Sequence, residues 1–385
     1  TFHRHGIGQI EVFPGVTTQE LTAFLSLLLV EPDEEDRFGH FAERLAGTGV
    51  LRVAVAPDRE SERDDPTDDA RRMAKRAYAQ TVAVARETMS ALRMGRGVSL
   101  RPVKRAVQSI VDQVLSNETS IVGLTTLRDY DEYTFTHCVN VCIFSVALGK
   151  KLGFDKHQLY ELGLGALLHD VGKVKMPWEL INKNGPLTNE EFEVLKEHPA
   201  EGVVALFEQR GLAELPLRAM LIAYEHHMKV DQTGYPRSAR PREPTLFGRI
   251  VAVADGFDAA TTQRSYQAQP WPADRVLHEM RDNATRGFDP LVVKAFISMT
   301  GIYPIGSLVI LDTYELAVVV APSASPDAMH QPVVRIIHDS MGIPLDAPPV
   351  VDLAERNPST GEPLRSIIKT TEPERYGIHV GDYFV

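Results

Sequence analysis

Cysteine and long apolar runs are both scarce in this sequence of 385 residues. Cys138 and Cys142 are the only cysteines, and their spacing of four residues on an expected helix favours small buried side chains over a disulfide or a thiolate metal site. The longest apolar candidate, residues 21–30, contains Thr22 and Ser26 and runs into an acidic stretch, so it is too short and too polar to span a membrane. These absences predict a globular protein without a membrane span, which we expect in the cytoplasm.

Positive charge is also in deficit, because 41 Lys and Arg residues face 52 Asp and Glu residues and give a net charge of -11. Proteins that bind nucleic acid in general draw much of their affinity from Lys and Arg that neutralise phosphates, so binding to duplex nucleic acid is not expected. Basic residues nevertheless gather between residues 71 and 105, where Glu87 is the only acid. We interpret this segment as a solvated connecting helix that pairs with acidic segments elsewhere in the chain, such as residues 58–69, with a docking surface for a partner protein as the alternative.

The chain is predicted to be mainly α-helical, with segments of different texture at its two ends. Residues 7–56 show the order strand, helix, helix, strand, which is typical of a small α/β domain. Helical periodicity dominates from His137 to Thr300, and short β-branched runs beyond Gly301 predict strands over 308–310, 316–320 and 333–337. The predicted domains are a small α/β domain of unknown role over 1–60, a charged linker and connecting helix over 61–100, a helical bundle over 100–300 and a β-rich appendage over 301–385. The sequence begins at Thr1 rather than methionine, which leaves an upstream sensor domain open.

Seven histidine and aspartate residues form an ordered set along the predicted bundle: His137, His169, Asp170, His198, His226, His227 and Asp255. The gaps between them match about one helix plus a loop, which is how a bundle brings ligands from separate helices to one point. A lone buried histidine is usually satisfied by hydrogen bonds, but burying the whole set without a cation would cost about 1 to 3 kcal/mol for each unpaired group. The set therefore predicts a metal site, although any single member can instead support a ligand.

The composition of this set also indicates how many ions it holds and of what kind. Imidazole and carboxylate without thiolate suit Fe, Mn, Co, Ni or Zn, and seven ligands are too many for one ion. We therefore predict two ions, with Asp170 as the bridging ligand. Two ions roughly 3.5 to 4 Å apart are a common device for phosphoester hydrolysis.

Two longer motifs sharpen the prediction. His169-Asp170 continues to Gly172-Lys173, and His226-His227 continues through Asp231 to the turn Gly234-Tyr235-Pro236. These HD-x-GK and HH…D…GYP signatures resemble those of the HD-GYP family of bacterial cyclic di-GMP phosphodiesterases, a branch of the HD hydrolase superfamily. The resemblance covers about residues 100–300. It implies an HD-type helical bundle and a metal-dependent phosphodiesterase that hydrolyses cyclic di-GMP to linear pGpG by a hydroxide that two metal ions activate, with GMP left open as a further product.

The resemblance also implies roles for individual residues. Iron or manganese is the usual metal in the family, with Zn, Ni or Co as alternatives. Asp170 and Lys173 are the expected catalytic residues, and Lys173 would neutralise phosphate charge. Tyr235 and Arg264 match positions that contact the dinucleotide, and Lys183 is a further candidate for substrate binding.

Several positions depart from the family pattern. Some members hold a third ion through a glutamate four residues before the first histidine, where this chain has Tyr133, so a binuclear site is expected. Met228 and Gln232 replace a glutamate and a glycine in the GYP loop, and Gln267 stands where a second basic phosphate contact often lies. Two alternatives therefore stay open: a low-turnover cyclic-dinucleotide receptor in a signalling module, and an HD phosphohydrolase acting on another nucleotide such as cyclic GMP-AMP. A homodimer or a signalling partner protein is also left open.

Overall fold

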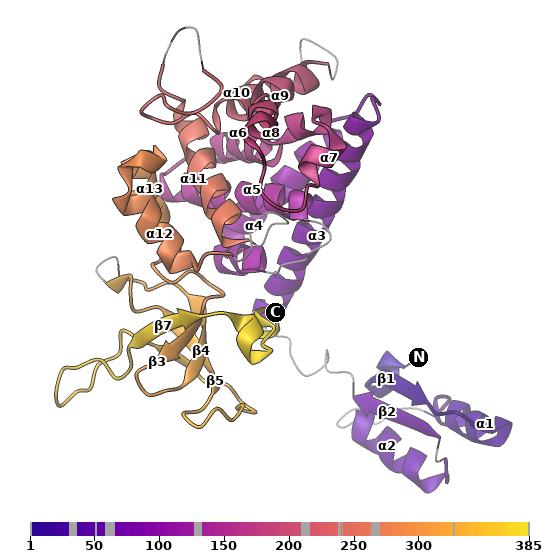
Figure 1. Cartoon of the computed structure of the whole chain (residues 1–385). Helices are drawn as coiled ribbons and strands as arrows, with labels where there is room; N and C mark the ends of the chain where they lie inside the picture. Colours follow the sequence, from indigo (N-terminus) through magenta and orange to yellow (C-terminus); the bar gives the residue numbers. More distant parts are fainter. Residues whose placement is uncertain are drawn as a thin grey trace. The chain divides into compact units, whose positions relative to one another are not determined.

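The computed structural model describes residues 2–30, 37–50, 52–57, 66–126, 133–208, 216–237, 240, 242–262, 270–325 and 328–383. The chain divides into two compact units, Thr1–Ala70 and Arg71–Val385 (Figure 1). The second unit contains the helical bundle and the C-terminal strands, and it holds all seven predicted metal ligands.

The N-terminal unit has the predicted order of strand, helix, helix, strand. Its elements are β1 (Ile7–Val12), α1 (Thr18–Leu27), α2 (Arg37–Gly47) and β2 (Val53–Pro57), and the two strands pair antiparallel. α1 begins at a capping box in which Thr17 accepts a hydrogen bond from the backbone N–H of Glu20 and the Glu20 carboxylate accepts one from the backbone N–H of Thr17. The core of this unit contains Ile7, Phe24, Leu28, Phe41, Leu45 and Val53.

Two long helices lead into the bundle, α3 (Pro66–Arg93) and α4 (Arg101–Gly123). Residues 94–100 separate the two helices. Gly95 adopts a φ of 69°, a left-handed conformation that suits the end of a helix. Pro102 lies in the first turn of α4, where a missing N–H loses no intrahelical bond. One face of α3 is buried in the main core.

The bundle is built around α5 (Tyr133–Lys151), which packs against α4, α6, α11 and α13. Residues Cys138 to Leu148 of α5 are buried on all sides, as expected for a helix at the centre of a bundle. Both cysteines are free and buried, which confirms the prediction made from their spacing. The other elements are α6 (Lys156–Leu167), η3 (Val171–Lys175), α7 (Trp178–Ile181), α8 (Asn189–Leu195), α9 (His198–Phe207), α10 (Leu217–Glu225), α11 (Leu246–Thr261), α12 (Ala273–Asp282), η5 (Ala284–Arg286) and α13 (Pro290–Thr300).

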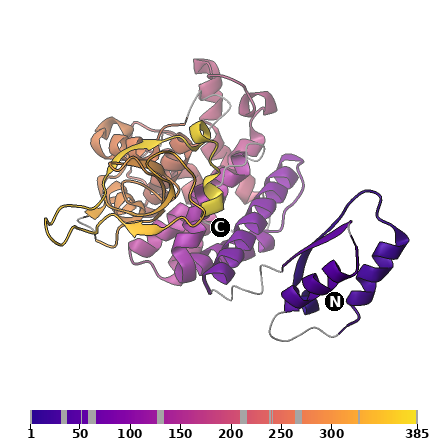
Figure 2. The same cartoon turned by 90° about the horizontal axis from the view of Figure 1, so that it is seen from below.

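The C-terminal region forms a five-stranded antiparallel sheet in the order β6-β5-β4-β3-β7, which is strongly curved (Figure 2). Its strands are β3 (Leu308–Leu311), β4 (Leu316–Ala321), β5 (Val333–His338), β6 (Val350–Asp352) and β7 (Ile367–Thr371). The first three coincide with the predicted strands. Sequence patterns missed β6 and β7 because β6 is three residues long and β7 has no fully buried residue. The mainly α-helical class with a β-rich appendage is confirmed.

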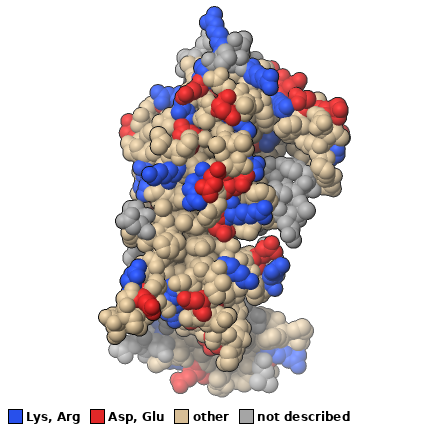
Figure 3. All heavy atoms as spheres, turned by 60° about the vertical axis from the view of Figure 1, so that its left-hand side comes forward, with Lys and Arg blue, Asp and Glu red and all other residues tan. Residues whose placement is uncertain are grey.

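The surface and the helix lengths bear on possible partners. On the face shown in Figure 3, Lys and Arg side chains are interspersed with Asp and Glu, so no large area of one charge forms on this face. Within the described ranges, no helix combines the length and the apolar character needed to cross a membrane.

Candidate metal centre

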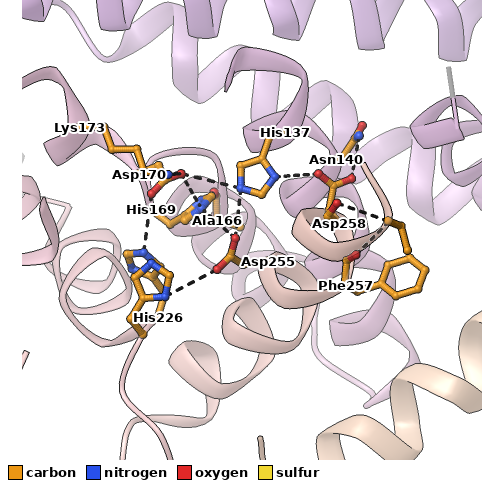
Figure 4. Close-up of polar contacts among 12 residues, drawn as sticks. His137, Asn140, Ala166, His169, Asp170, Lys173, His226, Asp255, Phe257 and Asp258 are labelled. Carbon is orange, nitrogen blue, oxygen red and sulfur yellow. Dashed lines mark hydrogen bonds and ion pairs between the residues drawn. The ribbon is translucent and has the colours of Figure 1, made fainter. Parts of the chain in front are cut away.

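All seven predicted ligands lie together in the second unit, although they come from five parts of the chain. Figure 4 labels five of them, His137, His169, Asp170, His226 and Asp255. His137 is on α5, and His169-Asp170 follows α6. His198 is the first residue of α9 and His226-His227 follow α10, while Asp255 is on α11. The convergence expected from the spacing of these residues is therefore present in the fold.

Asp170 lies between two groups of histidines. Its Oδ1 is 3.4 Å from Nε2 of His198 and 3.8 Å from Nε2 of His226. Its Oδ2 is 3.4 Å from Nε2 of His169 and 3.8 Å from Nε2 of His137. Each carboxylate oxygen thus faces a different pair of imidazoles, which is the arrangement needed for a carboxylate that bridges two cations.

Asp255 spans the same two groups from the other side. Its Oδ1 is 3.1 Å from Nε2 of His137 and 3.9 Å from Nε2 of His169, whereas its Oδ2 is 3.8 Å from Nδ1 of His227. Together, the two aspartates therefore place at least one carboxylate oxygen near each of the five imidazoles.

The residues present fit a pair of divalent cations. The ligand atoms fall into two groups, one of Asp170, His198, His226 and His227 and the other of His137, His169 and Asp170, and within each group they lie within 4.8 Å of one another. Among the described residues, Nε2 of His169 and Oδ1 of Asp170 are buried without a hydrogen-bond partner. Buried polar atoms are rarely left in this state, and a cation would satisfy both. Nitrogen and oxygen donors without thiolate suit first-row transition ions.

Comparison with known proteins agrees with this geometry. Residues 111–292, which contain every candidate ligand, match the family model described as HD domain. Over these residues the chain is similar to HD-domain proteins. It is 35% identical over 274 residues to a cyclic di-GMP phosphodiesterase of Pseudomonas aeruginosa, an alignment that covers 71% of this chain and 62% of the relative.

Two relatives from Vibrio cholerae match a shorter part of the chain. A cyclic di-GMP phosphodiesterase is 40% identical over 196 residues, 48% of this chain and 40% of the relative. A 3′3′-cGAMP-specific phosphodiesterase is 32% identical over 164 residues, 43% of this chain and 31% of the relative. The chain thus spans less than two thirds of the length of each of these curated relatives.

Three histidines of the metal site are each oriented by a backbone carbonyl oxygen three residues earlier in the chain. Nδ1 of His169 lies 2.7 Å from the carbonyl oxygen of Ala166, and Nδ1 of His198 lies 2.7 Å from that of Leu195. The Nδ1 of His226 makes the same contact with Ala223 at 2.9 Å. A carbonyl oxygen can only accept, so Nδ1 carries the proton and the lone pair of Nε2 points toward the centre of the site.

His137 is oriented by Asp258, a residue that sequence reasoning missed. Its Nδ1 lies 2.7 Å from Oδ2 of Asp258, and both residues are buried. Asp258 is three residues after Asp255 and therefore on the same face of α11, and this spacing is the signal that could have found it.

A second missed residue is Glu225, which precedes His226-His227 and is fully buried. Its Oε2 accepts hydrogen bonds from the backbone N–H and the hydroxyl of Thr245, at 2.8 and 2.6 Å, and Arg242 forms an ion pair with its other oxygen. Thr245 caps α11, so Glu225 ties the end of α10 to the start of the helix that carries Asp255.

The HD-x-GK motif needs its glycine for close packing. A Cβ at Gly172 would lie 1.9 Å from the carbonyl oxygen of His198 and 2.4 Å from the backbone nitrogen of Gly202. No rotation of a side chain relieves a clash with backbone, so η3 would have to move away from α9. Gly172 thus allows Asp170 and His198 to meet.

Gly172→Ala is therefore expected to lower the free energy of unfolding by about 1 to 3 kcal/mol and to reduce metal content. Chemical denaturation and elemental analysis measure the two effects. Gly97→Ala is the matched control, because a Cβ at Gly97 meets nothing within 4 Å. If both variants behaved alike, close packing at Gly172 would not be what holds the motif in place.

Burial and ion pairing shift the pKa values of the site in opposite directions. Burial is the main influence on His198 and His226, lowering the pKa of His198 to about 3 and that of His226 well below its usual value. Burial also lowers the pKa of His137, but its hydrogen bonds to Asp255 and Asp258 outweigh this and raise the pKa to about 9. Without a cation, a proton on His137 offsets part of the negative charge of the aspartates.

The metal-free protein is expected to be most stable near pH 6.5. His198 and His226 take up protons near pH 6.5 only when the chain is unfolded, so stability falls as the pH drops from about 6.5 toward about 3. The contribution of His137 is fully present below about pH 6.5 and is lost as the pH rises through about 9. Thermal unfolding of chelator-treated protein between about pH 5 and pH 9 measures the loss of stability on both sides of pH 6.5. A melting temperature that rises steadily through this range would contradict the expected effects of these histidines.

The predicted substrate-binding residues lie in different surroundings from one another. Lys173 forms an ion pair with Oδ2 of Asp170 and is partly exposed at the edge of the site. Lys183 instead pairs with Glu191, the residue that completes the capping box of α8. Arg264, like Gln267, lies outside the described residues.

Tyr235 lies against two histidines of the metal site. Its ring centroid is 4.7 Å from that of His227 and 6.3 Å from that of His198. The Tyr235-Pro236 bond is cis, and the backbone N–H of Tyr235 donates to the carbonyl oxygen of His227 at 3.2 Å. A Cβ at Gly234 would lie 2.2 Å from that same oxygen, so the GYP turn folds directly onto the metal site.

The departure at Gln232 has a visible consequence in the same loop. Gln232 has a φ of 65°, in the left-handed region that glycine adopts without cost. The loop therefore keeps the backbone conformation that a glycine would favour, with a bulkier residue in it. Tyr133, at the position of the third-metal glutamate, is the first residue of α5.

Proposed function

We propose that this protein is a metal-dependent phosphodiesterase that hydrolyses a 3′-5′ bond of cyclic di-GMP to give linear pGpG. The observation that carries the proposal is the position of Asp170, whose two oxygens face two separate groups of histidines. The curated relatives named cyclic di-GMP phosphodiesterases support the choice of substrate.

The seven ligands would hold two divalent ions, and we propose iron or manganese, with Zn, Ni or Co as alternatives. Such ions polarise phosphoryl oxygens and lower the pKa of a water molecule that attacks the phosphorus. His198, His226 and His227 would serve one ion, and His137 and His169 the other. Asp170 and Asp255, which lie beside both groups, keep the site anionic so that it retains cations.

The remaining residues of the site would bind and orient the dinucleotide. Lys173 is close enough to Asp170 to neutralise a phosphate held at the cations, and it is partly open to solvent. Tyr235 covers His227 and His198 and offers a ring on which a base stacks or a hydroxyl that a phosphate accepts from. Arg264 belongs to the proposal as a second phosphate contact on the strength of the family resemblance alone.

A second substrate, 3′3′-cyclic GMP-AMP, is favoured by one observation. A relative named as specific for 3′3′-cGAMP is 32% identical over 164 residues, a level similar to that of the cyclic di-GMP relatives. Met228 and Gln232 lie in the loop that presents Tyr235, so this loop is where the chain would distinguish guanine from adenine.

The test is product analysis with metal-loaded protein. Protein loaded with Mn, or with Fe under anaerobic conditions, is incubated in parallel with cyclic di-GMP, 3′3′-cyclic GMP-AMP and a cyclic mononucleotide, and the products are separated. Linear pGpG as the main product is expected. Unchanged cyclic di-GMP that is tightly bound would instead establish a receptor, and cleavage of the mononucleotide alone would establish a different phosphohydrolase.

The setting of the reaction belongs to the same proposal. A cytoplasmic protein is supported by the two free thiols of Cys138 and Cys142, because cytoplasmic cysteines are kept reduced. Fractionation of cells that produce the protein tests the location. Light scattering at several protein concentrations tests for a homodimer.

A further inference from the structure

His137 is held differently from three other histidines of the site. The orientations of His169, His198 and His226 are each set by a backbone carbonyl three residues earlier. His137 is set by Asp258, which lies on a different helix. The direction of the His137 lone pair therefore depends on how α5 and α11 pack, whereas the other three depend mainly on local backbone.

Asp258 is in turn held by Asn140. The side-chain amide of Asn140 donates to Oδ1 of Asp258 at 2.9 Å and to the carbonyl oxygen of Thr125 at 3.3 Å. Its own oxygen accepts a hydrogen bond from the hydroxyl of Tyr78 at 3.0 Å. Both oxygens of Asp258 thus accept from fixed donors, which only a carboxylate can do at this position.

These residues form a buried network, defined as Tyr78, Asn140, Asp258 and His137. Their exposed fractions are 9%, 4%, 2% and 2%. In such surroundings a hydrogen bond is strong, and breaking one leaves a buried polar atom without its partner. The network is therefore expected to be rigid, so that a change at Tyr78 alters the orientation of His137.

The network links the connecting helix to one group of metal ligands. Tyr78 is on α3, the helix that follows the N-terminal unit in the chain, and Figure 4 shows Asn140 and Asp258 leading to His137. His137 belongs to the group of His169 and Asp170, and not to the other group. We propose that Tyr78, Asn140 and Asp258 are positioning residues for His137, and that the packing of α3 thereby sets the affinity of one of the two cation sites.

This inference deepens the proposed function, because it rests on the metal centre but not on the substrate. It also predicts an asymmetry that a general loss of stability would not produce. Loosening the network should weaken the site served by His137, while the site served by His198, His226 and His227 keeps its ion. Counting ions without any nucleotide present is therefore the appropriate measurement.

The experiment compares Asp258→Asn and Tyr78→Phe with the wild-type chain. Asparagine at position 258 must turn an N–H toward either His137 or Asn140, so this variant should bind one ion about 10 to 100 times more weakly and the other normally. Tyr78→Phe removes only a hydroxyl and should weaken the same site by a smaller factor. Tyr160→Phe is the matched control, because Tyr160 lies on α6, outside the network, and packs at the edge of the same core.

Competitive titration of Mn and electron paramagnetic resonance separate the outcomes, because a coupled pair of ions gives a different spectrum from a single ion. One strong and one weakened site in both variants is the expected result. Equal weakening of both sites, or two unchanged sites in Tyr78→Phe, would overturn the inference even if Asp258→Asn failed to fold. A wild-type chain unable to hold two ions would overturn both this inference and the metal centre, whereas two bound ions without cleavage of cyclic di-GMP would overturn only the proposed function.

Discussion

Asp170→Ala is expected to empty both cation sites and to reduce cleavage of cyclic di-GMP at least about a thousandfold. The carboxylate is the one side chain that belongs to both groups of ligands, and each of its oxygens faces a different pair of histidines among the described residues. Removing it takes away a shared ligand and half of the carboxylate charge that the two aspartates supply. Elemental analysis of the purified variant and a product assay measure the two effects.

The control for this variant is Asp346→Ala, since Asp346 is an exposed aspartate in the C-terminal region. It should keep both ions and full activity. A variant at Asp170 that kept one ion per chain at wild-type affinity would show that the carboxylate serves a single site. The bridging assignment would then be wrong, although a metal-dependent reaction at one ion would remain open to testing.

The metal site was the part of the molecule most open to prediction from sequence. Histidine and aspartate are poor core residues, so finding seven of them on apolar, helix-spaced stripes already indicated that they form a common metal site. The order of the residues along the chain then matched a bundle in which each helix contributes one or two ligands. The structure brings all of them together.

The residues that support the ligands were not predictable in the same way. For Asp258 the only local signal is its spacing of three residues from Asp255, which places both on one face of α11. Asn140 is a single polar residue inside a helix, and its local sequence does not distinguish a buried network from a solvated surface. Tyr78 is 62 residues away from Asn140 along the chain, so their contact arises only when α3 packs on the bundle. Glu225 similarly acquires its role from Thr245, 20 residues later.

The sequence indicated which basic residues could contact a substrate, but it did not indicate which groups they contact in the structure. Lys183 was a candidate because of its charge and its place in a loop, and the structure pairs it with Glu191. The HD-x-GK motif suggested that Lys173 lies beside the site, and it does, but the motif did not reveal that its ammonium group contacts Asp170. The motif therefore predicts that the lysine lies near the metal site, but the group that its ammonium contacts depends on the charges around it.

Lys173→Met is expected to separate metal binding from catalysis. In the structure the Lys173 ammonium group competes for the oxygen of Asp170 that a cation would use. Burial raises the pKa of Asp170, but the charge of Lys173 and the interaction with His169 outweigh this and hold the pKa well below its usual value. Cations on Asp170 would repel the ammonium group toward the edge of the site, where a substrate phosphate attracts it. The variant should therefore hold its metal ions at least as tightly as the wild type, while kcat/KM for cyclic di-GMP falls about 100-fold to 1000-fold because one cationic contact to the phosphate is lost.

Lys175→Met is the matched control for this prediction. Lys175 lies two residues further along η3, pairs with Glu208 and is more exposed than Lys173, so its loss removes the same charge without touching the site. Its kcat/KM and metal content should match the wild type. A Lys173→Met variant that lost its metals would make the lysine a support for Asp170, and one with an unchanged kcat/KM would show that the lysine does not contact the substrate. The expected result is retained metal with a reduced kcat/KM. The same lysine would then neutralise Asp170 when cations are absent and the substrate phosphate when cations are bound.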